Sequence, residues 1–515
     1  MPTARTWLPD WSHYPEQLTP LSATVWFEAV GLGIHAAMRT LRGPFGGFDA
    51  RTDGGWAYEG EWAVEWEPVA GTLVEAGLAL PERWEREYRP RAHEITAQIR
   101  LMRPESPDPK GALAELDRMW GLAREHWTIH FLAVIPAQAA MDAAAERYAA
   151  ETGDQDELGA YALFDGPNES TAADAMLADL AEQARDLRVD DVLAAYRPPL
   201  ALERLAELEN GRTWLHGLRE YLAAYGGRAR LHEMSLPREA ERPWMTLEAI
   251  RLLIQAGGLT SAGSLRGGAS APGRGPADAA EVSPELAEVL PAARFCYALK
   301  ESHVYHIDYP GLLATREALL GFGRRLLAEG VLEAIDDLWM LRREEVRAAV
   351  AGEIGRQEVV ELVTAAREEL RRGLAEGPRP FLGDPPAEGD REGFLEKFYG
   401  RGDGAPGGRL LQGTPASRGI ADGPARIVRD AGDLARVRPG DVLVAATTTP
   451  AWTPLFGALA GLVTETGGVL SHAAIVAREY RLPAVVGAAD ATTVLVDGRP
   501  VRVDGDAGTV EPLTP

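Results

Sequence analysis

The sequence contains a single cysteine, Cys296, among 515 residues, so no disulfide can form within the chain. A protein without disulfides fits a reducing compartment, where a lone cysteine is most simply a small apolar residue of the core. Residues 1–10 lack the apolar segment of a signal peptide. No apolar run approaches the roughly 20 residues that span a bilayer. We therefore expect a cytoplasmic protein that makes no contact with membranes.

Positive charge is also scarce, because 53 Lys and Arg residues face 77 Asp and Glu residues, for a net charge of −24. Nucleic acids require basic surfaces, so this balance excludes them as the expected partner. The imbalance is uneven: residues 410–515 hold nine basic and eleven acidic residues. A nearly neutral C-terminal region can approach a nucleotide with little repulsion.

Motifs for binding nucleotides are missing as well. The sequence contains no P-loop, no protein-kinase signature and no dinucleotide-binding glycine motif. The glycines of residues 263–268 lie in low-complexity sequence with no predicted strand before them. The regular alternation of strands and helices that makes a (β/α)₈ barrel is not found either. The chain thus shows no sequence signature of a nucleotide site of its own.

Helical periodicity dominates the sequence up to residue 375. Apolar residues recur at spacings of three and four in these ranges: 113–150, 171–195, 200–225 and 286–374. Residues 43–66, rich in Gly and Trp, predict a loop or hairpin instead. Residues 256–280 are low-complexity and predict a flexible loop. We expect one mainly α-helical domain over residues 1–375.

The remaining sequence predicts a linker and a second domain, as a chain of this length suggests. Residues 376–409 are dense in Gly, Pro and charge, which is typical of a linker. Short β-rich runs then alternate with helices, at residues 425–428, 441–446, 461–464, 484–486 and 501–503. The expected fold is therefore multidomain: a helical N-terminal substrate domain, the linker, and a compact α/β domain over residues 410–515.

The most informative motif places one histidine at the start of a predicted helix, within residues 464–480. Gly467 and Gly468 allow a tight turn close to an anion, and Ser471 is a good N-cap for the helix. Free N–H groups and the positive end of the helix dipole would stabilise a phosphate on the His472 ring. A neutral imidazole is a competent nucleophile near pH 7. The motif predicts that His472 carries a phosphoryl group.

Around this motif the chain resembles the phosphohistidine (mobile, or swivelling) domain of phosphoenolpyruvate synthases, pyruvate phosphate dikinases and rifampicin phosphotransferases. The further segments that carry the resemblance are residues 413–419, 440–444, 448–454, 482–487 and 501–505. Residues 448–454 have the T-x-P-x-W-x-P form found in rifampicin phosphotransferases. The resemblance implies that His472 is the catalytic carrier on a domain that swings between two sites. Five residues are expected to lie around the phosphate: Thr466, Gly467, Gly468, Ser471 and Arg478.

Two stretches before residue 250 resemble the substrate-binding region of rifampicin phosphotransferases. One is Leu18-Thr19-Pro20-Leu21, and the other runs from Tyr225 through Arg228 to Glu233. Arg228 and Glu233 follow a glycine turn, and could position a phosphate and an acceptor hydroxyl or form a plain surface ion pair. The family usually has an Arg-Glu pair where Lys300-Glu301 stands here. Lysine loses the planar two-pronged contact of arginine, which puts phosphate binding at that substrate-site position in doubt.

Histidines of the helical region are further candidates for substrate contact. His126 and His130 are spaced i, i+4, so they lie on one face of a predicted helix. No Glu completes a metalloprotease signature and no cysteine is near, so we predict no metal there. A substrate pocket or a general base is the alternative to a plain core position; His303 and His306 are weaker candidates. Eleven of the thirteen tryptophans precede residue 250, and some could line an apolar cavity.

The resemblance also implies how His472 would be charged. Relatives of this type begin with an ATP-grasp domain, whereas this sequence begins with the substrate-like region. We therefore expect a separate ATP-grasp subunit that binds ATP and Mg²⁺. This subunit would transfer the β-phosphate to His472 and leave AMP and inorganic phosphate. The present chain would bind no cofactor itself. The acceptor is a small-molecule hydroxyl, with dehydration of the product left open. The alternatives are a phosphoenolpyruvate-dependent carrier and a non-catalytic small-molecule binding protein.

Overall fold

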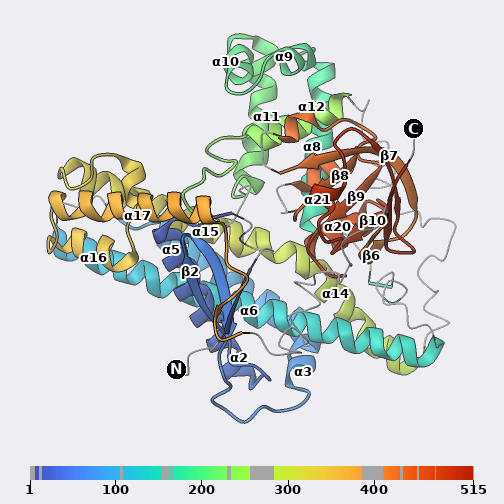
Figure 1. Cartoon of the computed structure of the whole chain (residues 1–515), viewed down its shortest axis with the longest axis horizontal. Helices are drawn as coiled ribbons and strands as arrows, with labels where there is room; N and C mark the ends of the chain where they lie inside the picture. Colours follow the sequence, from blue (N-terminus) through green and yellow to red (C-terminus); the bar gives the residue numbers. More distant parts are fainter. Residues whose placement is uncertain are drawn as a thin grey trace. The chain divides into compact units, whose positions relative to one another are not determined.

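The structure of the chain, a computed structural model, is shown in Figure 1. It describes residues 6–10, 14, 16–104, 108–153, 160, 163–164, 168–228, 233–255, 283–385, 410–429, 433–448, 452–469 and 471–513. The chain divides into two compact units. The first comprises Met1–Gln155, Leu231–Pro237 and Ser283–Glu388, and the second comprises Asp156–Arg230, Arg238–Val282 and Gly389–Pro515.

The first unit is mainly helical, as the periodicity predicts. Its elements are β1 (Thr6–Pro9), α1 (Pro20–Val25), the π-helical η1 (Trp26–Val30), α2 (Gly31–Leu41), β2 (Phe48–Asp53), β3 (Trp56–Glu61), α3 (Thr72–Leu78), α4 (Leu80–Arg83), the π-helical η2 (Trp84–Tyr88), α5 (Arg89–Arg100), α6 (Pro109–Thr152), α14 (Pro284–His306), α15 (Asp308–Ala328), the 3₁₀-helical η3 (Ile335–Met340), α16 (Arg343–Ala351), α17 (Arg356–Glu376) and β4 (Leu382–Gly383). Helices α2, α3 and α14 pack along the long helix α6.

Helix α6 runs for 44 residues and confirms the helix expected over residues 113–150. The side chain of Asp108 caps its start by accepting hydrogen bonds from the N–H groups of Lys110 and Gly111. Its end is marked by Gly153, whose φ of +72° is a conformation that favours glycine. Several helices of the first unit pack against this long helix.

The junction between α14 and α15 positions the groups of a buried histidine cluster described below. The Ser283 side chain caps α14 by accepting from the N–H of Leu286 at 3.1 Å. Helix α14 ends at His306, and Ile307, with φ −112° and ψ −72°, separates it from α15, which begins at Asp308. This sharp break places the last turn of α14 beside the first turn of α15.

A four-stranded antiparallel sheet in the order β2-β3-β1-β4 completes the first unit. The β2–β3 hairpin confirms the loop-or-hairpin prediction for residues 43–66. Strand β4 corrects another prediction, because Leu382 pairs with Trp7 of β1 and the Tyr58 hydroxyl donates to the Arg379 carbonyl. Residues 376–385 therefore belong to the first unit rather than to a linker, because a sheet edge supplies backbone partners that composition does not reveal. Residues 386–409 lie outside the described residues.

The second unit contains an eight-stranded mixed sheet with short helices. Its elements are α8 (Glu169–Asp186), α9 (Asp190–Ala195), α10 (Leu200–Glu207), α11 (Glu209–Tyr225), α12 (Trp244–Gln255), β5 (Leu411–Gln412), β6 (Thr414–Ser417), β7 (Ile420–Val428), the 3₁₀-helical η4 (Asp433–Arg436), β8 (Val442–Ala445), α19 (Thr453–Phe456), β9 (Gly461–Thr464), α20 (His472–Glu479), β10 (Ala484–Val486), α21 (Ala491–Val494), β11 (Pro500–Asp504) and β12 (Thr509–Pro512). The strand order is β5-β12-β11-β7-β8-β9-β10-β6, with β7, β8, β9 and β10 parallel. All five strand runs predicted after residue 425 are confirmed.

The core of this α/β domain lies on both faces of the central strands. Every residue of β8, β9 and β10 is buried, as is typical of parallel strands covered on both sides. Successive side chains of a strand point to opposite faces. Accordingly, Leu443 and Leu462 pack in the apolar cluster that contains α19 and α20 residues, whereas Val444 and Val463 pack in the cluster that contains α21 and β11 residues.

Helices α8–α12 belong to the same compact unit as the α/β domain. They confirm the helices expected within residues 171–195 and 200–225. Ala249 and Leu252 of α12 lie in the buried cluster that also contains α19 and α20 side chains. The helical domain expected over residues 1–375 is thus divided between two units in this structure, because one of its apolar faces packs on the α/β domain. The loop expected at residues 256–280 lies outside the described residues.

Two helical stretches of the described chain, Pro20–Leu41 and Pro109–Thr152, are long and apolar enough to cross a membrane. The expectation that no apolar run reaches this length is therefore wrong. In their most apolar windows 61% and 50% of the residues are buried inside the structure. Burial of this kind is found in the core helices of soluble proteins, because other helices cover the apolar faces.

Candidate functional site

The predicted carrier histidine is the first residue of α20, directly after the loop that follows β9. Ser471 has extended backbone angles, φ −64° and ψ 156°, and its Oγ accepts from the N–H of Ala474 at 3.4 Å. It is therefore the N-cap that the sequence predicts. The first-turn N–H groups and the positive end of the helix dipole lie at His472, an arrangement that favours an anion there.

Gly467 makes the turn before this helix possible. Its φ is +108°, and a Cβ added to it would lie 2.8 Å from Ser471 Oγ and 3.0 Å from Ser471 Cβ. A side chain at this position would therefore collide with the capping serine. The carbonyl of Gly468 accepts from the N–H of Ser471 at 3.0 Å and closes the turn. The glycine pair thus permits the close approach of the loop to the helix start.

Two threonine hydroxyls brace the loop that leads to His472. Thr464 Oγ1 donates to the carbonyl of Thr466 at 2.8 Å, and Thr466 Oγ1 donates to the carbonyl of Ala446 at 3.0 Å. Both threonines are buried. In this structure they hold backbone segments together, and contact between Thr466 and a phosphate stays a prediction.

The His472 ring is held by a residue that the sequence analysis did not single out. His472 Nε2 lies 3.2 Å from Oγ1 of Thr453, which is fully buried at the start of α19. A hydroxyl can donate to an unprotonated ring nitrogen or accept from a protonated one, so Thr453 orients the ring in either state. Thr453 belongs to the T-x-P-x-W-x-P segment, so the sequence contained a signal that could have identified it. Residues 449–451 of this segment lie outside the described residues.

Arg478 lies on α20 but its guanidinium contacts the sheet. Its Nη1 donates to the carbonyl of Ala416 at 3.0 Å, and Ser417 Oγ donates to the carbonyl of Ala477 at 3.2 Å. Both hydrogen bonds join α20 to β6 and keep the carrier helix in place. The phosphate contact expected of Arg478 stays a prediction.

The C-terminal end of the carrier helix is bound to α8. The Tyr480 hydroxyl donates to the carboxylate of Asp174, and the side-chain amide of Asn168 donates to the carboxylate of Glu479. The Tyr480 ring also packs edge-on against Phe456 of α19, with centroids 6.3 Å apart. The structure therefore connects the α/β domain that contains His472, called the carrier domain below, directly to a helix that precedes it in the chain.

Arg228, expected to bind substrate, is buried in the second unit. Its Nη2 donates to the hydroxyl of Tyr221 at 2.8 Å, and its guanidinium lies 5.8 Å from the ring centroids of Tyr221 and Tyr225. Nearby, the carboxylate of Glu239 accepts from the N–H and hydroxyl of Thr246. Burial raises the pKa of Glu239 to about 7. The hydrogen bonds from Thr246 and the positive charge of Arg228 oppose this increase. The sequence analysis did not identify Glu239.

Glu233, the other half of that predicted pair, belongs to the first unit. Its carboxylate accepts from the backbone N–H and the hydroxyl of Thr19, and from the hydroxyl of Ser22. It thereby stabilises the start of α1. Arg228 and Glu233 fall in different units. Within the first unit, Glu233 contacts Thr19, so the segment that contains Glu233 meets the Leu18–Leu21 segment there.

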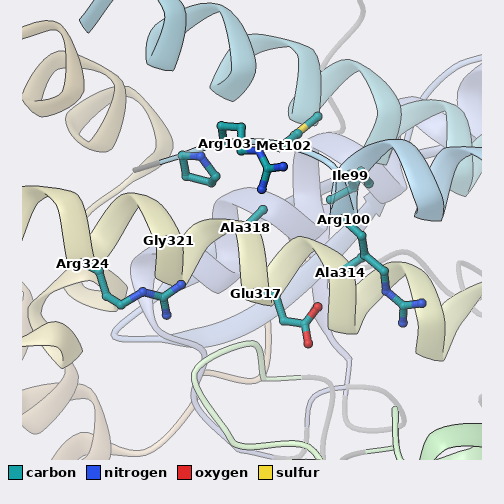
Figure 2. Close-up of a pocket in the computed structure, with 10 residues that line it drawn as sticks. Ile99, Arg100, Met102, Arg103, Ala314, Glu317, Ala318, Gly321 and Arg324 are labelled. Atoms are coloured by element: carbon teal, nitrogen blue, oxygen red, sulfur yellow. The ribbon is translucent and has the colours of Figure 1, made fainter. Parts of the chain in front are cut away.

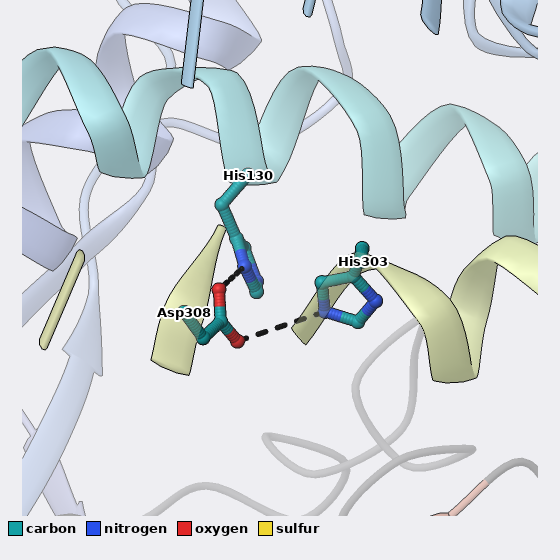
Figure 3. Close-up of side chains that lie close together, drawn as sticks. All are labelled: His130, His303 and Asp308. Atoms are coloured by element: carbon teal, nitrogen blue, oxygen red, sulfur yellow. Dashed lines mark hydrogen bonds and ion pairs between the residues drawn. The ribbon is translucent and has the colours of Figure 1, made fainter. Parts of the chain in front are cut away.

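His126 and His130 face a cluster that spacing alone did not show. His130 Nδ1 lies 2.7 Å from Asp308 Oδ1, and His303 Nε2 lies 3.7 Å from Asp308 Oδ2 (Figure 3). The rings of His130 and His303 are 4.8 Å apart. His126, one turn earlier on α6, is buried, and its Nε2 has no hydrogen-bond partner among the described residues. We call His130, His303 and Asp308 the His₂Asp cluster.

Burial governs the electrostatics of this part of the first unit. It lowers the pKa of both His126 and His303 to about 4, so these imidazoles are neutral near pH 7. Burial alone would raise the pKa of Asp308, but its histidine neighbours lower it below the ordinary value and keep the carboxylate ionised. Lys300 is buried on α14 with Glu301; burial lowers the pKa of Lys300 to about 8, while Glu301 and Asp142 oppose that shift.

A separate pocket of about 570 Å³ lies between α5 and α15 (Figure 2). Arg100, Arg103 and Arg324 line it together with Glu317, so its lining carries three guanidinium groups and one carboxylate. Ala314, Ala318 and Gly321 of α15 also line it, and a Cβ added to Gly321 would lie 2.9 Å from Pro104 Cγ. None of the residues predicted from the sequence lines this pocket.

Comparison with known proteins agrees with the geometry around His472. Residues 437–508 match the family described as "PEP-utilising enzyme, mobile domain", and residues 130–290 match the "rifampicin phosphotransferase fourth domain". The resemblance to these phosphotransferases is thereby confirmed over both segments. The first contains His472, and the second begins at His130 and contains Arg228 and Glu233.

Three curated relatives illustrate the similarity. A chondramide synthase of Chondromyces crocatus is 30% identical over 98% of this chain and 14% of its own length. An uncharacterized phosphotransferase of Bacillus subtilis is 32% identical over 61% of this chain and 38% of its own length. A rifampicin phosphotransferase of Streptomyces sviceus is 39% identical over 39% of this chain and 22% of its own length. The chain thus spans between 14% and 38% of the lengths of these relatives.

Proposed function

We propose that this chain carries a phosphoryl group on His472 and transfers it to the hydroxyl of a small molecule. The observation that carries the proposal is the position of His472, at the capped N-terminus of α20 within the segment that matches a mobile domain. Several relatives are named phosphotransferases, which supports the same class of reaction. The helical part of the chain would hold the acceptor.

The residues around His472 support two in-line transfers. In the first, a lone pair on the imidazole attacks phosphorus, so that an N–P bond forms while the P–O bond to the leaving group breaks. In the second, an oxygen of the acceptor attacks the same phosphorus, the N–P bond breaks, and the hydroxyl proton passes to a base. The N–H groups at the start of α20 stabilise the charge on the phosphate, and Thr453 orients the ring.

We further propose that the donor is ATP with Mg²⁺, bound by a separate ATP-grasp protein that supplies the β-phosphate. The α–β bond breaks as the histidine is charged and one water cleaves the β–γ bond, so that AMP and inorganic phosphate are left. The resemblance to rifampicin phosphotransferases supports this donor. Phosphoenolpyruvate is the second candidate, because the matching mobile-domain family is described as phosphoenolpyruvate-utilising. A cytoplasmic location is part of the same proposal, since ATP and a lone reduced cysteine both fit that compartment.

The fate of the acceptor is the last part of the proposal. A phosphate ester is a better leaving group than a hydroxyl, so loss of phosphate from the product would dehydrate the acceptor. Product masses distinguish the two results, because phosphorylation adds a phosphoryl group whereas dehydration removes one water.

The test is to incubate the purified full chain with ATP labelled at the β-phosphate, with and without a candidate ATP-grasp protein, and to measure acid-labile label. Label on the wild type that disappears in His472→Ala supports the proposal. His216→Ala is the matched control, because His216 is a solvent-exposed histidine of α11. Label that persists in His472→Ala would contradict the assignment of the carrier. If ATP gives no label, labelled phosphoenolpyruvate is tried, and no label from either donor would refute the carrier function.

A further inference from the structure

The His₂Asp cluster is assembled from three helices of the first unit. His130 comes from the middle of α6, His303 from the last turn of α14, and Asp308 from the first residue of α15. Figure 3 shows the Asp308 carboxylate between the two imidazoles, with one oxygen toward each ring. One ligand atom from each of the three residues can be chosen so that all lie within 4.8 Å of one another.

Hydrogen bonding leaves His303 with a lone pair that faces a carboxylate. His303 Nδ1 lies 3.0 Å from the carbonyl of Leu299, and a carbonyl oxygen can only accept, so Nδ1 carries the ring proton. In the neutral ring Nε2 is then unprotonated, and it lies 3.7 Å from Asp308 Oδ2. Two electron-rich atoms therefore face each other in a largely buried place, an arrangement that a cation between them would stabilise.

The Asp308 carboxylate has one oxygen toward each imidazole, with Oδ1 near His130 and Oδ2 near His303. His130 gives Asp308 one hydrogen bond through Nδ1, while the second carboxylate oxygen has no donor among the described residues. His126 adds another buried nitrogen without a partner, one turn along α6. The site thus brings an imidazole lone pair, a carboxylate and a further buried imidazole nitrogen close together.

We propose that His130, His303 and Asp308 bind a divalent transition-metal ion, of which Zn²⁺ is the representative. Zn–N and Zn–O bonds are about 2.0 to 2.2 Å long, so two ligands of one tetrahedral ion lie roughly 3.3 to 3.6 Å apart. The 3.7 Å between His303 Nε2 and Asp308 Oδ2 is close to this separation. The ion takes the place of the proton between His130 Nδ1 and Asp308 Oδ1, whose separation of 2.7 Å must widen when the ion binds. His130 then carries its proton on Nε2.

Two imidazoles and one carboxylate give the ion three protein ligands. This number is typical of sites in which a water or a substrate oxygen occupies the remaining position, whereas structural zinc sites have four protein ligands. The proposal rests on the first unit alone and does not depend on phosphoryl transfer by His472.

The test uses the full chain, treated with a chelator, incubated with Zn²⁺ and desalted, with bound zinc measured by elemental mass spectrometry. One equivalent of zinc per chain is expected. His303→Ala and Asp308→Asn should each weaken binding by at least about a hundredfold, since even the loss of groups that only orient metal ligands costs 10- to 100-fold. Co²⁺ bound at the same site should give visible absorption that both variants lose.

Two control variants identify where the metal binds. His216→Ala, on the exposed face of α11, should keep one equivalent of zinc. His306→Ala tests the neighbouring pair in which His306 Nδ1 lies 3.3 Å from His93 Nε2. The proposal is overturned if the wild type binds no zinc, if zinc survives both cluster variants, or if only His306→Ala abolishes binding. Asp308→Asn keeps the shape of the side chain, and the wild-type stoichiometry and Co²⁺ spectrum remain decisive if a variant fails to fold.

Discussion

Gly467→Ala is the substitution that tests most directly how the loop before α20 sets up the carrier histidine. Gly467 has φ +108°, and an added Cβ would lie 2.8 Å from the oxygen of Ser471. Ser471 is the N-cap of the helix that starts at His472. The methyl group must therefore either push the cap away or open the turn, and either change moves the histidine relative to the N–H groups that would hold a phosphate.

The expected magnitude has two contributions. Holding alanine at this backbone conformation costs about 1–3 kcal/mol, as other residues in sparsely populated regions do. Loss of the Ser471 cap costs about 1 kcal/mol more. We therefore expect the free energy of unfolding of the second unit to fall by roughly 2–4 kcal/mol. Labelling of His472 should fall further than the loss of folded protein explains.

Gly440→Ala is the matched control for this experiment. Gly440 lies in the same α/β domain with φ +84°, and a Cβ added there would meet nothing within 4 Å. It therefore measures backbone strain without the collision. Urea unfolding and acid-labile labelling of both variants are compared with the wild type. If Gly467→Ala matches Gly440→Ala in both measurements, the collision with Ser471 has no consequence and the reasoning fails.

Three further substitutions test other parts of the structure. Thr453→Val removes the hydroxyl that lies 3.2 Å from His472 Nε2 and should slow the labelling of His472 roughly tenfold, the equivalent of about 1.4 kcal/mol. Thr453→Ser keeps a hydroxyl and should label at the wild-type rate. Equal labelling rates in the two variants would exclude the orienting role of Thr453. Gly311→Ala would place a Cβ 2.1 Å from Cε1 of His126 and should destabilise the first unit by about 1–3 kcal/mol, measured by urea unfolding. Gly121→Ala on α6 is the control, because a Cβ there meets nothing within 4 Å. An unchanged unfolding midpoint in Gly311→Ala would show that the His126 ring moves aside freely. Burial raises the pKa of Glu239 to about 7, from an ordinary value of 4.5. Between pH 4.5 and pH 7 the folded state therefore binds more protons than the unfolded state. The contribution of Glu239 to stability is complete below pH 4.5 and is lost as the pH rises to 7. Over this range the free energy of unfolding should fall by about 3 kcal/mol, and a Glu239→Gln variant with the same slope would contradict this.

The carrier site could be predicted from the sequence because its parts are neighbours in the chain. The glycine turn, the capping serine and the histidine all lie within residues 467–472, and each acts through local backbone geometry. Thr453 was the exception, because its contact with His472 depends on how α19 packs in the α/β domain. The parallel strands were also predictable, since strands buried on both faces are continuous apolar runs.

The helical part was predicted as a set of helices but not as a set of contacts. His130 and His303 are far apart in the sequence, and their meeting depends on the break between α14 and α15. The i, i+4 spacing of His126 and His130 showed one shared face but could not show what packs on it. In the same way, the helical domain predicted over residues 1–375 did not reveal that an apolar face of α12 covers the α/β domain.

These contacts limit how the carrier domain can move. A motion that separated α20 from α8 would break the hydrogen bonds that Asp174 and Glu479 accept, each worth about 1.5–3 kcal/mol for a charged group. It would also expose Ala249 and Leu252 of α12, which are buried against the α/β domain. Within the second unit, α8 and α12 are therefore bound to the α/β domain by both polar and apolar contacts.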